Sequence, residues 1–182
     1  DYTDDKSRNI SGSYVGKVGS DTLSESMTGK PVFGMHFSTL IKDSRGTPLA
    51  VLTTRTNLSW VESEALGVTT SLAAGDIKTA TISIVDGEGT TIFDFNTSHG
   101  SSAPAELAKL TSANGQSQDS INAKSGTTGT ITVMHPLDKK EVVSAYGPVV
   151  SDNFPSALGW TLKVRADRDE MFATETKTMN EF

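Results

Sequence analysis

The chain of 182 residues contains no cysteine. This absence excludes disulfides, thiolate metal ligands, cysteine nucleophiles and iron–sulfur clusters together. Long hydrophobic runs are missing too, since no stretch approaches the 18 or more apolar residues that a membrane helix needs. The sequence as given is therefore not expected to span a membrane, and its polar first ten residues are not expected to be a signal peptide.

Basic residues are outnumbered, with 16 Lys and Arg against 22 Asp and Glu, which gives a formal net charge of −6. Because such a surface repels phosphate, nucleic acid is not an expected partner. Hydrophobic residues make up 35% of the chain, enough for the core of one domain or of two small lobes. Ser and Thr together make up about a quarter, a composition that favours an exported, β-rich protein.

Motifs that carry catalytic chemistry are also missing. None of the three histidines, His36, His99 and His135, has a partner at metal-ligand spacing. There is no nucleophile elbow and no P-loop, and the i, i+2 spacing of Glu62 and Glu64 places them on different faces of a helix. The chain is therefore predicted to be non-catalytic, with no cofactor and no metal site.

Two hairpins are the clearest structural signals. Residues 31–41 alternate apolar and polar positions, and residues 49–56 return beside them after the turn Asp43-Ser-Arg-Gly46. Residues 79–85 and 90–95 repeat this arrangement around Asp86-Gly-Glu-Gly89. In each turn Asp suits the first position and Gly suits a backbone with positive φ.

The rest of the chain is predicted from caps, breakers and alternation. The first thirty residues read as loops with short extended pieces, and a short helix capped by Asn57 or Ser59 ends at Gly67. The remaining expected elements are a helix at 104–110, a polar loop at 111–128, strands at 129–134, 141–150 and 159–166, and an exposed helix at 167–182.

The order β-β-α-β-β-β after residue 79 is the pattern of a PAS-like sheet, and the first hairpin looks like the back half of the same unit. The predicted fold class is α+β, with PAS-like antiparallel sheets and flanking helices. Residues 1–70 would form a partial first lobe and residues 71–182 a complete second lobe with a C-terminal helix. Trp160, in the closing strand, is expected to be buried because its large ring can cover the sheet.

The sequence also resembles the double Cache sensor domain. The resemblance covers roughly residues 15–175 and consists of Thr28-Gly29-Lys30 before the first apolar strand, the two D-x-x-G turns, and a closing strand that begins at Gly159-Trp160. It implies the sensor region of a bacterial chemoreceptor, histidine kinase or diguanylate cyclase, on the periplasmic or extracellular side of the inner membrane. The long N-terminal helix of that family and its R-x-W-Y signature are not in this chain.

The resemblance further implies a homodimer in the intact receptor, membrane contact only through segments outside this chain, and a small-molecule ligand. In amino-acid-binding members, the strand after the first D-x-x-G turn carries an aspartate for the ligand's ammonium group, and Arg55 stands there in this chain. Because a guanidinium fork suits a carboxylate, an organic acid is favoured over an amine. His36 and Ser38 on the neighbouring strand and Tyr14 in the preceding loop complete the predicted site.

Three alternatives stay open from the sequence. Arg55 could instead lie on the solvent side and pair with an acidic neighbour such as Glu62. The whole chain could be a surface or structural β-rich protein, such as an adhesin or pilus component without a small-molecule ligand, which would also explain the abundance of Ser and Thr. An enzyme of unrecognised type is the third reading.

Overall fold

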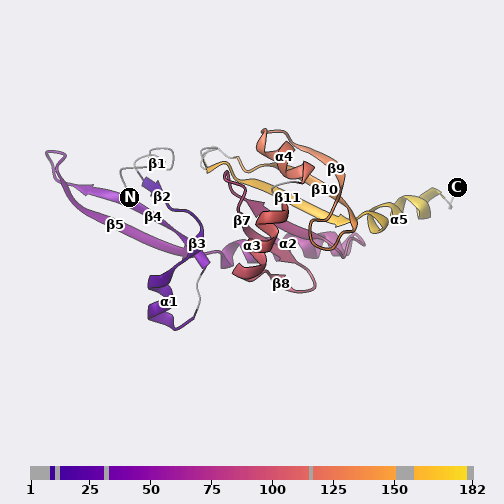
Figure 1. The fold of residues 1–182 in the computed structure, drawn as a ribbon, viewed down its shortest axis with the longest axis horizontal. Helices are drawn as coiled ribbons and strands as arrows, with labels where there is room; N and C mark the ends of the chain where they lie inside the picture. The colour runs from indigo at the N-terminus through magenta and orange to yellow at the C-terminus, as the bar shows by residue number, and fades with distance from the viewer. Residues whose placement is uncertain (1–8, 11–12, 31–32, 115–116, 151–157, 180–182) are drawn as a thin grey trace. The chain divides into compact units, whose positions relative to one another are not determined.

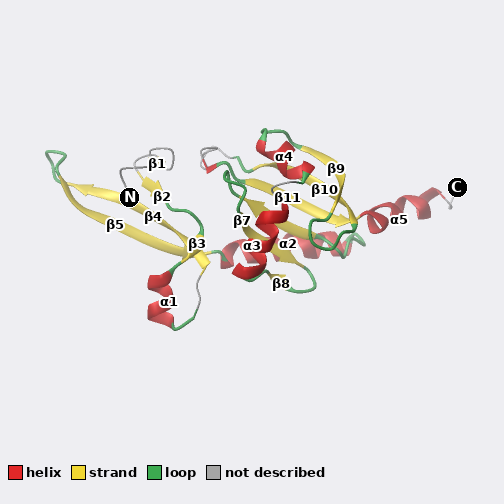
Figure 2. Cartoon of the chain, viewed as in Figure 1, coloured by secondary structure: helices red, strands yellow, loops and turns green. Residues whose placement is uncertain are grey.

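The computed structural model describes residues 9–10, 13–30, 33–114, 117–150 and 158–179. The chain divides into two compact units, one up to Trp60 and one from Val61 onwards. Both units combine antiparallel strands with helices, as Figure 2 shows, so the predicted α+β class is confirmed. None of the described helices is both long enough and apolar enough to cross a membrane.

The first unit is built on a long antiparallel hairpin, in which β5 pairs with one edge of β4 while β2 and β3 pair along the other (Figure 1). Its elements are β1 (Asn9–Ile10), β2 (Ser13–Val15), β3 (Gly19–Ser20), α1 (Thr22–Thr28), β4 (Phe33–Lys42) and β5 (Pro48–Asn57). Helix α1 was not predicted. It is capped by Asp21, whose side chain accepts from the backbone of Leu23 and Ser24, and it ends at Gly29 with φ +67°.

The second unit, from Val61, holds a six-stranded antiparallel sheet in the order β8-β7-β6-β11-β10-β9. The elements are α2 (Ser59–Ala74, which begins at the unit boundary), β6 (Thr81–Val85), β7 (Thr91–Asn96), β8 (Gly100–Ser101), α3 (Pro104–Asn114), α4 (Gln118–Lys124), β9 (Gly129–Met134), β10 (Glu141–Pro148), β11 (Thr161–Asp167) and α5 (Arg168–Met179). Helix α3 packs on β7, while α4 packs on β9, β10 and β11 (Figure 1).

Both predicted hairpin turns are confirmed, and they have the same geometry. One side-chain oxygen of Asp43 accepts hydrogen bonds from the backbone of Arg45 and Thr47, both at 2.8 Å. Asp86 accepts in the same way from Glu88 at 2.9 Å and Thr90 at 2.8 Å. The glycine that closes each turn has positive φ, +85° at position 46 and +90° at position 89.

Two boundary predictions were wrong. The predicted loop at 111–128 contains the end of α3 and all of α4. Helix α2 does not end at Gly67 but continues to Ala74, because Val61, Ala65 and Thr69 form a buried i, i+4 stripe. The packing of that stripe outweighs the roughly 1 kcal/mol that a glycine costs inside a helix.

The core of the second unit lies on both faces of its sheet. Ile82 on β6 and the parallel rings of Phe93 and Phe95 on β7 are buried on one face. Leu107 and Leu110 of α3 are buried as well. Trp160 is 5% exposed, which confirms the prediction that its ring is covered.

Candidate functional site

A small polar hollow of about 170 Å³ lies in the first unit, where the start of α1 meets strands β3, β4 and β5. Its charged lining residues are Lys17, Asp21 and Arg55, and His36 also lines it. Arg55 on β5 stands directly opposite His36 on β4 in the register of the hairpin. The hairpin therefore sets the two side chains side by side on one face of the sheet.

Arg55 makes an ion pair with Asp21, whose Oδ2 lies 3.2 Å from the guanidinium Nε. The Arg55 side chain is 41% exposed, so the pair lies at the rim of the hollow. The pKa of Asp21 is lowered, mainly by the hydroxyl of Ser24, which donates to Oδ2 at 2.6 Å, with the backbone of Ser24 and the charge of Arg55 assisting. Asp21 thus joins the cap of α1 to the cation on β5.

Of the four predicted site residues, two line this hollow and two do not. Arg55 and His36 line it, and the ring of Tyr14 lies 6.0 Å from the ring of His36. Ser38 shares their face of the sheet, but it is buried and its hydroxyl is hydrogen-bonded to that of Thr53 at 2.9 Å. It lies outside the lining.

The alternative in which Arg55 is exposed and pairs with an acidic neighbour is borne out, but the partner is Asp21 and not Glu62. Asp21 and Lys17 were missed in the sequence. The capping role of Asp21 could have been predicted from the sequence, because Asp is a common residue at the N-cap of a helix. Its contact with Arg55, 34 positions further along the chain, has no such local signal.

The imidazole of His36 lies directly over Gly16, whose backbone N–H donates to the carbonyl of His36 at 2.7 Å. A Cβ atom at position 16 would collide with the ring. The absence of a side chain at Gly16 therefore leaves room for the His36 ring at the edge of the hollow.

A second cluster of charged groups is buried in the other unit, between α4 and the sheet. Asp119, Lys163 and Arg165 are at most 1% exposed. Asp119 Oδ2 lies 2.8 Å from both Nε and Nη2 of Arg165 and accepts a hydrogen bond from Ser144 at 2.7 Å. Lys163 donates to the hydroxyl of Ser120 at 2.7 Å.

The pKa values of this cluster are strongly shifted. Burial opposes the ionisation of Asp119, but the charges of Arg165 and Lys163 outweigh it and lower the pKa to about 2. Burial and the neighbouring charge of Arg165 lower the pKa of Lys163 to about 7. On β7, burial raises the pKa of Asp94, whose Oδ1 accepts from Ser83 at 2.5 Å.

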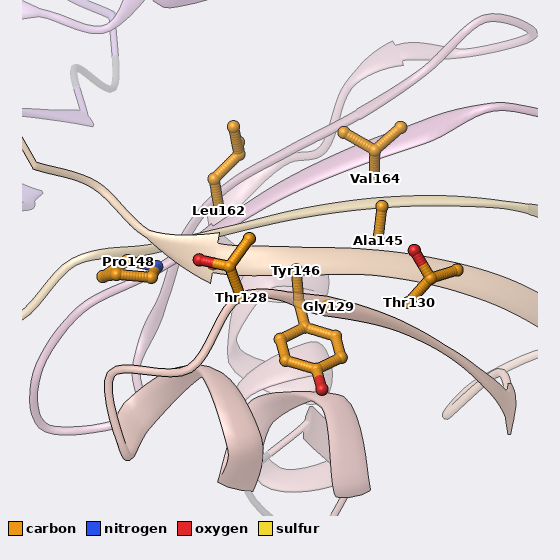
Figure 3. Close-up of a pocket in the computed structure, with 9 residues that line it drawn as sticks. Thr128, Gly129, Thr130, Ala145, Tyr146, Pro148, Leu162 and Val164 are labelled. Carbon is orange, nitrogen blue, oxygen red and sulfur yellow. The ribbon is translucent and has the colours of Figure 1, made fainter.

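Another hollow, of about 390 Å³, lies over the ends of β9, β10 and β11 and is shown in Figure 3. Leu162, Val164 and Ala145 point to one side of the sheet there, while Tyr146 points to the other, towards α4. The Tyr146 hydroxyl accepts from the side-chain amide of Asn122 at 3.1 Å. The lining contains no charged residue, so this hollow offers nothing to fix an ionic ligand.

Among the described residues, no group of three or more His, Asp or Glu side chains could hold a metal ion. The structure thus combines a six-stranded PAS-like antiparallel sheet in the second unit with a small polar hollow in the first.

No family model and no curated protein matches the sequence. The fold is similar to the periplasmic sensory domain of the Campylobacter jejuni chemoreceptor Tlp1, with 15% identity and a TM-score of 0.62 over 90% of this chain and 52% of that chain. It is also similar to the extracellular domain of vpHK1S-Z8, described as a histidine kinase, with 11% identity and a TM-score of 0.55 over 93% of this chain and 55% of that one.

A third similar structure is the extracellular domain of mmHK1S-Z3, also described as a histidine kinase, with 17% identity and a TM-score of 0.53 over 85% of this chain and 55% of that one. This chain spans little more than half the length of each of these domains. The predicted Cache-like, PAS-like architecture is therefore confirmed at the level of the fold.

Proposed function

We propose that this chain is an extracytoplasmic ligand-sensing domain of a bacterial transmembrane signalling receptor. The support is the fold, because the similar structures described above are periplasmic or extracellular domains of a chemoreceptor and of histidine kinases. The same likeness favours a sensor over an adhesin or pilus component. In this role the domain is non-catalytic, needs no cofactor, and lies on the outer side of the inner membrane.

The ligand that the first unit suits best is a small carboxylate. The observation that carries this proposal is the position of Arg55, whose guanidinium lies at the rim of a hollow with His36 beside it and only one acid, Asp21, in the lining. A guanidinium can hold a carboxylate through two parallel hydrogen bonds, and it cannot accept an ammonium group. The hollow, at about 170 Å³, is smaller than pockets for drug-sized molecules.

The signal would leave the domain through α5, which follows the closing strand β11 directly. The exposed side chains of Arg168, Asp169 and Phe172 indicate that this helix is not buried in the second unit. We expect α5 to continue towards a membrane segment outside this chain and the intact receptor to be a homodimer. A small displacement or rotation of α5 would then carry the signal.

A thermal-shift screen tests this function. Small organic acids, amino acids and amines are added to the wild-type chain, because a ligand that binds only the folded state raises the melting temperature by mass action. Organic acids should raise it, and amines should not. A screen in which amines alone are active would refute the carboxylate proposal, and a screen without any active compound would count against ligand sensing by this chain.

A further inference from the structure

Helix α4 is attached to the sheet of the second unit mainly by charged and hydroxyl groups. Its three buried residues are Asp119, Ser120 and Ala123, of which only the last is apolar. Its large apolar side chain, Ile121, is 49% exposed. Helices on a sheet are usually held by an apolar stripe, so what keeps α4 in place is the set of polar contacts made by Asp119 and Ser120.

The contacts of Asp119 have the geometry of a bound carboxylate. Its Oδ2 lies within 2.8 Å of two nitrogens of Arg165 and accepts a third hydrogen bond from Ser144. Lys163, two residues before Arg165 on the same face of β11, also favours the charged form of Asp119. The Asp119 carboxylate on α4 thus occupies the position on Arg165 that an oxyanion from solution would occupy.

Arg165 is buried, yet it also lines a polar hollow of about 150 Å³ formed by residues of β6, β7, β10 and β11 and of the connection between β9 and β10. The other charged residues of this lining are Lys78, Lys140, Asp138 and Asp167. Lys140 is paired with Asp167 at 3.6 Å, and Asp138 lies 3.2 Å from His135, whose pKa is lowered by burial.

A second hollow, of about 330 Å³, lies beside Ser117 at the start of α4 and shares His135 with the first. The larger hollow adjoins the beginning of α4, and the smaller one reaches Arg165, whose Nη2 lies 3.5 Å from the hydroxyl of Ser117. A small anion can approach the guanidinium without unfolding the sheet.

We propose that the second unit contains an oxyanion site at Arg165 and that α4 is its displaceable lid. A small oxyanion, a carboxylate or phosphate group, takes the place of the Asp119 carboxylate on Arg165, and α4 leaves the sheet. This inference goes beyond the function proposed above, because its site lies in the other unit and uses none of the residues around Arg55.

The test measures binding of sodium acetate and sodium phosphate by calorimetry, with sodium chloride at matched ionic strength as reference, in three variants of the chain. Asp119→Asn removes the internal competitor, and Ser144→Ala removes only one of its hydrogen bonds. Asp169→Asn removes the same charge from an exposed position on α5 and is the control. Amide hydrogen exchange of residues 118–124 measures how often α4, the proposed lid, leaves the sheet.

Molecules in which Asp119 occupies Arg165 cannot bind the anion, and this lowers the apparent affinity of the site. Asp119→Asn removes the competing charge and should therefore bind the anion at least about tenfold more tightly than the wild type. Ser144→Ala should shift the affinity in the same direction by less, and Asp169→Asn should bind like the wild type. The anion should also speed exchange in α4 of the wild type. Binding of both probes assigns a general oxyanion site, and binding of acetate alone assigns a carboxylate site.

Equal affinities in all three variants, or wild-type exchange in α4 that the anions leave unchanged, would overturn the proposal. If Asp119→Asn does not fold, the anion affinity of Ser144→Ala tests the proposal by itself, because that variant keeps the ion pair of Asp119 with Arg165. Arg55→Ala serves to separate the two sites, because it should leave binding at Arg165 intact even if the first unit binds nothing.

Discussion

The side chain of Lys163 has no exposed surface. Replacing it by methionine should stabilise the protein relative to the wild type, and this gain should be larger at neutral than at alkaline pH. Its pKa is lowered from the ordinary value of 10.5 to about 7, first by burial and then by Arg165. Between these two values the unfolded chain binds more protons than the native state, so the free energy of unfolding rises with pH across this window.

The magnitude follows from the size of the shift. A difference of 3.5 pKa units, from 10.5 to 7, corresponds to about 5 kcal/mol at 1.36 kcal/mol per unit. Nearly all of this cost is present at pH 6, and about 1 kcal/mol of it remains at pH 10. Methionine has a similar length and no charge, and replacing a buried ion by an apolar side chain is often neutral or stabilising.

Urea unfolding of the wild type and Lys163→Met at pH 6, 8 and 10 measures this effect. The stability of the variant relative to the wild type should fall by about 4 kcal/mol from pH 6 to pH 10. A stability difference that stays constant over this range would refute the conclusion that Lys163 is buried with a lowered pKa.

Two further changes test the packing of the second unit by chemical denaturation. Gly159→Ala should destabilise the fold by about 1–3 kcal/mol, since φ is +60° there and a Cβ would lie 2.9 Å from the Cα of Gly87; an unchanged midpoint would contradict this backbone geometry. Trp160→Ala should cost about 3–5 kcal/mol because the ring is buried, and a cost below about 1 kcal/mol would indicate an exposed edge position.

Local patterns were sufficient to predict both hairpins. The D-x-x-G turns specify their own geometry, because the aspartate side chain binds the backbone of the same turn. Alternation then places β4 and β6 beside the strands that follow them. These features depend on residues only a few positions apart, and a single sequence contains that information.

Helices α1 and α4 were missed for a shared physical reason. Helix α1 buries no residue, and α4 buries Asp119 and Ser120, so neither has the apolar stripe from which helices are predicted. What holds them in place are contacts with distant residues, Arg55 for the cap of α1 and Arg165 for α4.

Strand β11 explains why the buried ionic cluster could not be predicted. Its alternation of Leu162 and Val164 with Lys163 and Arg165 reads as an apolar inner face and a charged outer face. The structure has the opposite arrangement, because the charged side chains lie under α4 and Leu162 is 38% exposed. The ion pair of Arg165 with Asp119 and the hydrogen bond from Lys163 to Ser120 make that orientation tolerable.

The measurement that tests the sensing proposal most directly is calorimetry of the best organic acid from the screen against the wild type and Arg55→Ala. Arg45→Ala, which removes an exposed arginine in the turn of the same hairpin, is the matched control. Because Arg55 is partly exposed, loss of the guanidinium should weaken binding by about 1.5–3 kcal/mol, the range for hydrogen bonds to charged groups, while the control should bind like the wild type. Unchanged affinity in Arg55→Ala, or a best ligand that is a cation, would contradict the assignment of Arg55 as the anchor of the ligand.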